Sequence, residues 1–185
     1  MSWATRRQLA MLAAEDGNLA QAEQDLTSLI DTLEQAHSIA GESESTNSYD
    51  LCRCLLGRAS VRSWAVKLRE AMEDLKIAER LAHQQKPLNR RILLINVLQH
   101  KADLLSTAFS PLYDPLLAQT TINALRDLTP EEWMVATAEM HLSQQQRDWQ
   151  NVVEQAGIII DSLGQTGWVR GVNAARSVAA HAECK

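Results

Sequence analysis

Aromatic residues, glycine, proline and cysteine are all scarce in this chain of 185 residues. It contains 5 Trp, 2 Tyr, 1 Phe, 7 Gly, 4 Pro and 3 Cys. So few aromatic residues disfavour a sheet protein, because strands are rich in aromatic and β-branched side chains. So few glycines and prolines exclude collagen-like and low-complexity chains. An odd, small number of cysteines does not indicate a disulfide framework, so we expect a globular protein of a reducing compartment, the cytoplasm.

Long apolar runs are absent as well. No run approaches the roughly 18 to 20 residues that cross a bilayer, and no apolar segment of a signal peptide follows the start Met1 to Arg7. We therefore expect no membrane partner. Hydrophobic residues still make up 45% of the chain, which is enough for a sizeable core. This length favours a single domain over 1–185.

Apolar residues recur at helical spacing along almost the whole chain. The pattern predicts an all-α protein of antiparallel helical hairpins, with a polar loop at 41–47. Thr129-Pro130-Glu131-Glu132 predicts a capping box with Thr129 as N-cap, and Asp148 predicts an N-cap for the helix that follows it. The expected helices cover about 3–15, 19–40, 48–66, 68–85, 89–107, 116–128, 130–146, 149–163 and 166–182.

Four of the expected helices share a pattern of small and apolar residues. A small residue is followed by an apolar residue four positions later and by another apolar or small residue three beyond. A small residue lets two helix backbones approach each other, while the larger residues fill the space beside it. The first member of each set is therefore an expected close-contact point. The sets are Ala22-Leu26-Leu29, Ala71-Leu75-Ala78, Ala118-Ile122-Leu125 and Val152-Ala156-Ile159.

Positions around this pattern resemble the tetratricopeptide repeat family. Gly17 lies five residues before Ala22, as in the turn typical of that family. Leu56-Gly57 resembles the family's Leu-Gly pair, and Pro130 falls 12 residues after Ala118, where the family's closing proline would lie. The chain thus resembles a degenerate array of these repeats, and an unrelated α-bundle is the alternative.

The resemblance covers about four helix pairs over 3–163, followed by a capping helix at 164–185. It implies a right-handed superhelix with a concave groove that binds a peptide or a partner protein. Some family members hold a partner's C-terminal carboxylate with Lys and Asn. Aligning Leu9-Ala10 with the Leu-Gly pair places Arg7 and Met11 at the corresponding positions, so that clamp is not expected here.

The charge of the chain is distributed unevenly. Lys and Arg outnumber Asp and Glu by 10 to 4 over 51–91, but are outnumbered by 9 to 2 before this segment and by 10 to 6 after it. A basic middle predicts either an anion-binding face or charge complementarity between neighbouring helices.

Three arginines of this basic segment form the candidate binding face. On one continuous helix, Arg58, Arg62 and Arg69 would lie within about 40° of one another. Guanidiniums aligned in this way could hold a carboxylate-rich peptide or phosphate groups. Trp64 is the nearest large side chain that could anchor a partner beside them. The alternative is that the arginines face acidic residues of the helices before and after, those on the first being Asp25, Asp31 or Glu34.

No motif for catalysis, nucleotide binding or metal binding is complete. Glu34-x-x-His37 has the spacing of half a di-iron site but no second copy. Cys52 and Cys54 point about 160° apart on a helix and do not suit one metal ion, so one should pack in the core and the other lie nearer the surface. His181-Ala182-Glu183 lacks the remainder of a deaminase signature. We therefore expect a chain that is not an enzyme and uses no cofactor and no metal.

A helical array without reacting groups favours a non-enzymatic protein-interaction module, an adaptor or chaperone-like scaffold that binds a peptide or partner segment. An acidic partner would match the basic face. The alternative is a regulatory domain whose groove accepts a small molecule or short peptide and transmits its occupancy to a partner. The net charge of −5 disfavours nucleic acid, and a homo-oligomer is left open. The expected plugs of the hairpin junctions are Trp64, Trp133, Trp149 and Trp168, with Trp64 as the candidate exception.

Overall fold

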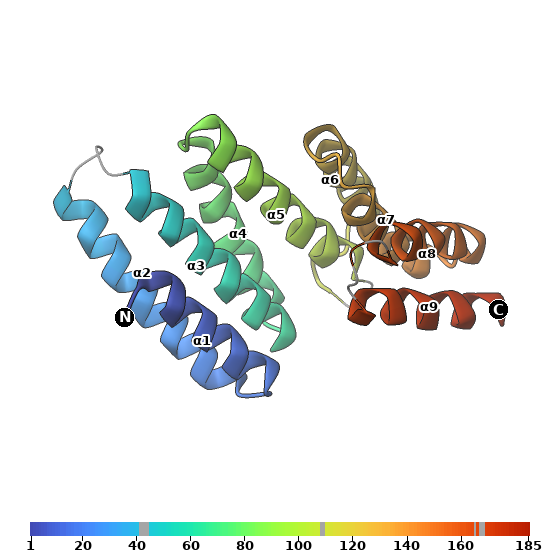
Figure 1. Cartoon of the computed structure of the whole chain (residues 1–185), viewed down its shortest axis with the longest axis horizontal. Coiled ribbons are helices and arrows are strands. Elements are labelled where there is room, and N and C mark those ends of the chain that lie inside the picture. Colours follow the sequence, from blue (N-terminus) through green and yellow to red (C-terminus); the bar gives the residue numbers. More distant parts are fainter. Residues whose placement is uncertain (41–44, 108–109, 165, 167–168) are drawn as a thin grey trace. The chain divides into compact units, whose positions relative to one another are not determined.

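The computed structural model describes residues 1–40, 45–107, 110–164, 166 and 169–185. Within these residues the chain is all-α and contains no strand, so the predicted fold class is confirmed (Figure 1). None of the helices in the described part is both long and apolar enough to span a bilayer. The helices are α1 (Trp3–Glu15), α2 (Leu19–Ala40), α3 (Ser45–Trp64), α4 (Leu68–His83), α5 (Pro87–Ser106), α6 (Pro115–Leu128), α7 (Glu132–Gln146), α8 (Trp149–Gly164) and α9 (Val169–Glu183).

The ends of the helices lie within three residues of the predicted ones. Most of the predicted loop at 41–47 lies outside the described residues, and α3 already begins at Ser45. The N-cap at Asp148 is confirmed, because its carboxylate accepts the backbone N–H of Asn151 at 3.2 Å.

The predicted capping box before α7 is wrong. Thr129 is the C-cap of α6 in extended conformation, as expected for a residue before proline. Its hydroxyl accepts the N–H of Glu131 at 3.1 Å in a local turn. Glu131, not Thr129, is therefore the N-cap of α7, and its side chain makes no capping hydrogen bond.

The chain divides into two compact units, Met1–His100 and Lys101–Lys185, and the division falls within α5. We call them unit 1 and unit 2. The single domain over 1–185, the four repeats over 3–163 and the capping role of 164–185 stay predictions.

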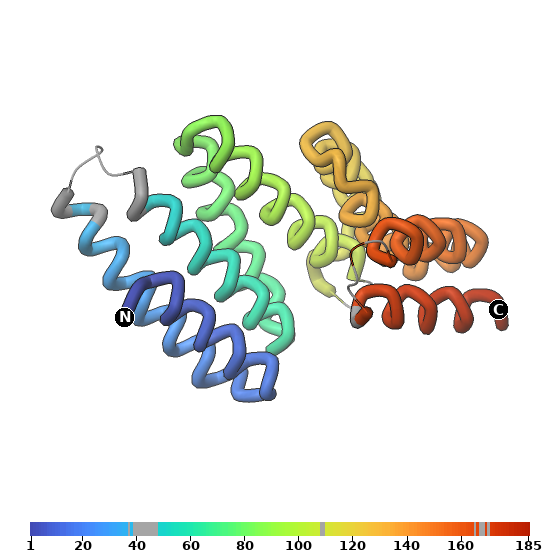
Figure 2. Tube along the Cα trace, in the orientation of Figure 1, coloured from blue at the N-terminus to red at the C-terminus, as the bar shows by residue number. Residues whose placement is uncertain are grey.

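In unit 1, consecutive helices run in opposite directions, so α1, α3 and the unit 1 part of α5 share one direction (Figures 1 and 2). Helix α3 lies at the centre of the packing, in contact with α1, α2 and α4. Gly57 makes this possible, because a Cβ there would lie 3.3 Å from Met11 Sδ and 3.5 Å from Leu26 Cδ2. The side chains buried most completely in unit 1 include Leu26, Leu29, Leu33, Leu55, Leu75 and Leu93.

In unit 2, helices α7, α8 and α9 share one apolar core, and α6 contacts α7. Trp133 and Trp149 are partly buried against this core, in agreement with the predicted packing role of these two residues. Helix α9 contributes apolar side chains on one face only. The core residues are Ala136, Met140, Val152, Ala156, Ile159, Leu163, Val172, Ala175 and Ala182.

Three helix hairpins turn through the same local geometry. Each has one residue with positive φ, which is Gly17 at 90°, Val66 at 60° and Arg147 at 60°. In each turn the N–H of the following residue donates to the carbonyl five residues before it, at 2.8 to 3.0 Å, which is the bond of a helix C-cap in the Schellman motif. Glycine adopts such φ values without strain, whereas the β-branched Val66 does not.

The predicted close-contact residues follow these turns at a fixed distance. Ala22, Ala71 and Val152 each lie five residues after the positive-φ residue. These three and Ala118 are fully buried, as predicted. In all four helices the N–H of this residue donates to the carbonyl four residues before it, at 2.8 to 3.0 Å. The second helix of each hairpin therefore begins in the same way.

Candidate functional site

Arg58 and Arg62 are engaged inside unit 1 by acidic and hydroxyl groups of the helices on either side of α3. Nε and Nη2 of Arg58 donate to the two carboxylate oxygens of Asp74 on α4, at 3.0 and 2.7 Å, and Nη1 donates to Thr27 Oγ1 on α2 at 3.2 Å. Nη1 of Arg62 donates to Asp74 Oδ2 at 2.9 Å. The Asp74 side chain is only 2% exposed. Its charge is therefore compensated by two guanidiniums in a largely dehydrated position.

Glu23 on α2 completes this arrangement. It accepts Arg62 Nε at 2.9 Å and Lys67 Nζ at 2.6 Å. The hydrogen bond from Lys67 and then that from Arg62 lower the pKa of Glu23 against the opposing effect of burial. We refer to Arg58, Arg62, Lys67, Asp74 and Glu23 as the arginine–carboxylate network, which joins α2, α3 and α4.

The network confirms the alternative left open by the sequence, in which these arginines face acidic residues of the neighbouring helices. The acidic partners named from the sequence are wrong, because Asp25, Asp31 and Glu34 lie on the exposed face of α2. Glu23 and Asp74 take their place. Binding of a partner by Arg58 and Arg62 stays a prediction, and their guanidiniums are already occupied.

Arg69 does not share a helical face with Arg58 and Arg62, so this part of the prediction is wrong. Helix α3 ends at Trp64 and the turn at Val66 reverses the chain, which places Arg69 in the first turn of α4. Its side chain is exposed. It accordingly forms no part of a stripe on α3.

Among the tryptophans that the sequence singled out and the structure describes, Trp64 is the exposed one. Its side chain is 49% exposed at the end of α3, next to the exposed Val66. By contrast, Trp149 packs its ring edge-on against the ring of His181, with 6.1 Å between centroids. Trp168 lies outside the described residues. A role for Trp64 in anchoring a partner stays a prediction.

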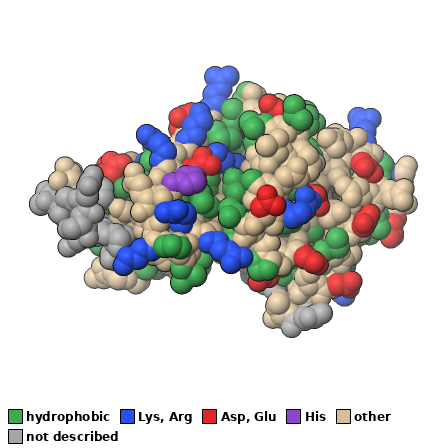
Figure 3. Space-filling model, turned by 90° about the horizontal axis from the view of Figure 1, so that it is seen from above, with side chains coloured by type: hydrophobic (Ala, Val, Ile, Leu, Met, Phe, Trp, Pro, Cys, Tyr) green, Lys and Arg blue, Asp and Glu red, His purple; other side chains and the backbone are tan. Residues whose placement is uncertain are grey.

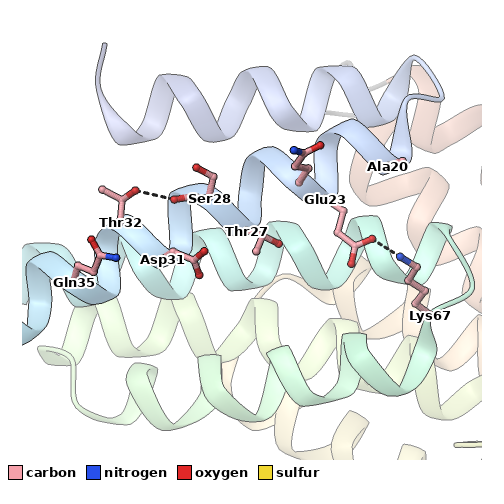
Figure 4. Close-up of a pocket in the computed structure, with 9 residues that line it drawn as sticks. Ala20, Glu23, Thr27, Ser28, Asp31, Thr32, Gln35 and Lys67 are labelled. Atoms are coloured by element: carbon pink, nitrogen blue, oxygen red, sulfur yellow. Dashed lines mark hydrogen bonds and ion pairs between the residues drawn. The ribbon is translucent and has the colours of Figure 1, made fainter.

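One hollow of unit 1 runs along the exposed face of α2 (Figure 4). It encloses about 570 Å³, and in Figure 4 the Glu23 carboxylate points toward Lys67. Thr32 Oγ1 donates to its own helix, to the Ser28 carbonyl at 2.7 Å. The hollow thus offers solvated polar groups of one helix, and its lysine is already paired. Its lining is Ala20, Glu23, Gln24, Thr27, Ser28, Asp31, Thr32, Gln35 and Lys67.

A second hollow of unit 1 is built by three helices of common direction, and we call it the α1–α3–α5 hollow. It encloses about 190 Å³ and has no Asp or Glu in its lining. The polar and cationic residues of the lining outnumber the remaining ones, which are Met11, Leu56 and Gly57. Figure 3 shows Lys and Arg side chains, a histidine and several acidic side chains on the part of the displayed face that unit 1 contributes. The lining is Arg7, Gln8, Met11, Arg53, Leu56, Gly57, Ser60, Asn96 and His100.

Two arginines, Arg7 and Arg53, line this hollow, and its lining contains no carboxylate. Burial, and then the neighbouring charge of Arg53, lowers the pKa of Arg7. The Arg53 guanidinium donates to Tyr49 Oη at 3.1 Å and lies 5.9 Å from the centre of its ring. No acceptor in the described part of the chain hydrogen-bonds the Arg7 side chain, although the charge of Asp50 acts on it. This pair of cations is the site that reasoning from the sequence missed.

A signal for the hollow was present in the sequence. Its side chains occur in pairs four residues apart, on one face of each helix: Arg7 with Met11, Arg53 with Gly57, and Asn96 with His100. Such pairs become informative only once the three helices are known to be neighbours. Ser60 Oγ on α3 lies 3.4 Å from His100 Nε2 on α5, which fixes that neighbourhood.

The remaining candidates from the sequence form no site. Cys52 and Cys54 are both buried, so the prediction that one lies nearer the surface is wrong, because α3 is packed on several sides. Burial raises the pKa of Cys52 to about 12 and that of Cys54 to about 11, which makes both thiols poor nucleophiles. The side chain of His37 lies outside the described residues. Over the part of the chain that is described, no three His, Cys, Asp or Glu side chains cluster to hold a metal ion.

Unit 2 contains a polar hollow of about 300 Å³ between α5 and α7, which we call the His141 hollow. His141 Nδ1 lies 3.0 Å from Asp103 Oδ1, and this contact raises the pKa of His141. Ser106 is 1% exposed, and its hydroxyl has no hydrogen-bond partner among the described residues. The lining is Asp103, Ser106, Thr107, His141, Gln144 and Gln145.

No protein-family model matches this chain, and neither a curated protein nor a solved structure is similar enough to it to be matched.

Proposed function

We propose that this chain is a non-enzymatic interaction module of tetratricopeptide-like helical hairpins, which binds a segment of a partner protein at the α1–α3–α5 hollow. The observation that carries the proposal is the half-buried Arg7, whose guanidinium lacks a hydrogen-bond acceptor and shares a hollow with Arg53. A half-buried guanidinium that makes no hydrogen bond within the described residues is free to donate to an anionic group of a partner. A cytoplasmic location and a homo-oligomeric state remain predictions.

The repeated hairpin turn supports the tetratricopeptide-like arrangement. Gly17, Val66 and Arg147 occupy equivalent positions, and each is followed five residues later by a fully buried small or branched residue. Repeats of this kind stack so that corresponding helices line one extended surface, which suits binding of an extended segment. In unit 1 the corresponding helices are α1, α3 and α5. We include the right-handed superhelix in this proposal.

The proposal can be tested by photo-crosslinking from inside and outside the hollow. Gln8 lines the α1–α3–α5 hollow and is exposed, and Gln24 is an equally exposed glutamine in the α2 hollow. A photo-reactive residue at position 8 should capture a discrete protein from the native cytosol, whereas the same residue at position 24 should not. Arg53→Ala should remove the capture at position 8. Equal capture at both positions, or capture indifferent to Arg53→Ala, would contradict the proposal.

A regulatory, small-molecule-binding role is a second candidate, favoured by the buried Ser106 hydroxyl without a partner in the His141 hollow. A buried hydroxyl that makes no hydrogen bond costs about 1–3 kcal/mol, and a small polar ligand would supply that bond. Native mass spectrometry of protein from its own cells should then reveal a bound molecule that Ser106→Ala loses. The absence of an added mass under gentle ionisation would count against this candidate.

A further inference from the structure

The α1–α3–α5 hollow brings two guanidiniums to one level of unit 1. Met11 and Gly57 are in contact, since a Cβ on Gly57 would lie 3.3 Å from Met11 Sδ. Arg7 and Arg53 each lie four residues before this contact, about one helical turn, on helices that run in the same direction (Figure 1). The close approach at Gly57 therefore places the backbones of Arg7 and Arg53 at the same level of the two helices, and both side chains line the hollow.

The charges around the hollow leave a surplus of two positive charges. The lining contains the two cations Arg7 and Arg53 and no Asp or Glu. Arg6 and Asp50, which also act on the nearby Cys54 thiol, lie outside this lining. Arg6 lies with its guanidinium 5.7 Å from the centre of the Trp3 ring, which does not neutralise it. The two cations of the lining sum to +2, and the charges of Arg6 and Asp50 outside it oppose each other. A carboxylate ligand would leave one of these charges uncompensated, whereas a phosphate monoester carries a charge of about −1.5 to −2 at neutral pH.

We propose that this hollow binds a phosphate group borne by a side chain of the partner segment, with Arg7 and Arg53 donating to its oxygens. This inference rests on the proposed function and specifies the chemistry of the ligand. Paired guanidiniums match phosphate oxygens in geometry and charge. The hollow of about 190 Å³ is open to solvent, so a phosphate group can enter it together with bridging water.

The test uses a minimal probe, phosphoserine blocked as its N-acetyl N-methylamide, titrated into the full chain and followed by the NMR signals of the arginine side chains. We expect saturable binding that shifts the Arg7 and Arg53 signals. Arg7→Ala and Arg53→Ala should each weaken binding at least about tenfold, because each removes charge-assisted hydrogen bonds. Arg69→Ala is the matched control, because Arg69 is an exposed arginine of the same unit outside the hollow, and it should leave binding unchanged.

Lysine variants test the geometry of the contact and show that loss of binding is not loss of fold. Arg7→Lys and Arg53→Lys keep the charge but lose the two-pronged donor, so each should bind more weakly than the native chain and more tightly than the alanine variant. Circular dichroism melting of all variants checks that unit 1 remains folded. Equal binding by the lysine and native chains would show a diffuse charge effect and overturn the assignment.

Three further outcomes overturn the proposal. These are binding of acetate as tight as that of the blocked phosphoserine, binding of inorganic phosphate without binding of the blocked residue, and binding of unphosphorylated blocked serine. None of these measurements requires the partner protein. If the probe fails while a photo-reactive residue at position 8 still captures a partner in an Arg53-dependent manner, the phosphate assignment falls and the interaction module stands. The reverse result leaves an anion site without the module.

Discussion

Helix α3 directs arginines toward two sides of unit 1, and the arginines have different neighbours on the two sides. Toward α2 and α4, Arg58 and Arg62 meet Asp74 and Glu23 and form a closed network. Toward α1, Arg53 meets another arginine, Arg7, in a hollow without a carboxylate in its lining. Arginines of one helix are thus structural on one side and available on the other. Whether an arginine of α3 is structural or available depends on the side chains of the neighbouring helices. It does not depend on the number of basic residues in the segment.

The largest effect is expected from removing the carboxylate at the centre of the closed side. Asp74→Asn leaves Arg58 and Arg62 in place without their shared counter-charge, and breaking a buried ion pair from one side costs about 3–5 kcal/mol. Urea unfolding should show this loss in the free energy of unfolding. Glu73→Gln on the same helix is the control, because Glu73 is exposed and its ion pair with Lys76 is exposed as well, and it should change stability by less than about 0.5 kcal/mol. Similar small losses for both variants would show that the network is not structural.

The double change Arg58→Ala with Arg62→Ala tests the same side from its cationic partners. It leaves Asp74 buried and without its ion pairs, so we expect a loss of about 3 kcal/mol in the free energy of unfolding. Capture of a partner at position 8 should persist at a temperature where the variant is folded. Lost capture with unchanged stability would instead make Arg58 and Arg62 a binding face, as the sequence first suggested.

Overpacking the hairpin contacts should have the next largest effect. Ala71→Leu and Ala118→Leu add volume at fully buried positions, one in each unit, and each should lower the free energy of unfolding by about 1–3 kcal/mol. Chemical denaturation followed by circular dichroism measures both. Ala20→Leu is a control at the exposed face of α2 and should be nearly neutral. A neutral Ala71→Leu would show that α4 does not require a small residue at this contact.

The contrast between the buried close-contact residues and the arginines explains which features the sequence could predict. Helix ends, the buried set Ala22, Ala71, Ala118 and Val152, and the stop at Gly17 are local properties, fixed by helical periodicity and backbone conformation. The partners of Arg58 and Arg62 depend on how three helices are rotated about their axes, which periodicity does not specify. Treating Arg69 as part of the same stripe failed because no glycine or proline marks the turn at Val66.

The candidate hollow was missed for the same physical reason. It forms only where α1, α3 and α5 meet, and each helix contributes only a few residues that form no recognisable binding motif. The error about Cys52 and Cys54 has a related cause. Because α3 is packed on several sides, residues that point in different directions from it are both buried. The local sequence pattern therefore predicts the helices and their buried residues. Which arginines remain available for a ligand depends on charge compensation between helices.

The strained turn offers a stabilising change. Val66 has φ of 60° and is 76% exposed, and a non-glycine residue in the left-handed region costs about 1–2 kcal/mol. Val66→Gly should therefore raise the free energy of unfolding by about 1 kcal/mol. Gly17→Val is the reciprocal control, because a Cβ there meets no atom within 4 Å and only the backbone conformation opposes it. It should destabilise the chain, and a stabilising Gly17→Val would contradict this account of the turns.

The smallest effect concerns an ion pair that, unlike the network of unit 1, is half exposed. Asp103 and His141 in unit 2 have side chains 37% and 42% exposed, so solvent screens the pair and its contribution is below about 1 kcal/mol. The hydrogen bond to Asp103 raises the pKa of His141 above its ordinary value of 6.5. A raised histidine pKa means that the folded state holds the proton more tightly than the unfolded state does. The pair therefore adds its full stability below about pH 6.5, and this stability is lost as the pH rises through the folded-state pKa.

His141→Gln should accordingly be less stable than the native chain at about pH 5.5 and nearly equal to it at about pH 8, on the two sides of the histidine range. Urea unfolding at both pH values measures the difference, and an NMR titration of His141 in the native chain should give a pKa above 6.5. His181→Gln is the control, because His181 contacts the Trp149 ring and has no ion pair in the described part of unit 2. A stability difference that grows toward high pH has the opposite sign and would mean that the folded chain favours neutral His141. The contrast with Asp74 would then be one of sign as well as size, because the exposed pair would oppose folding where the buried network supports it.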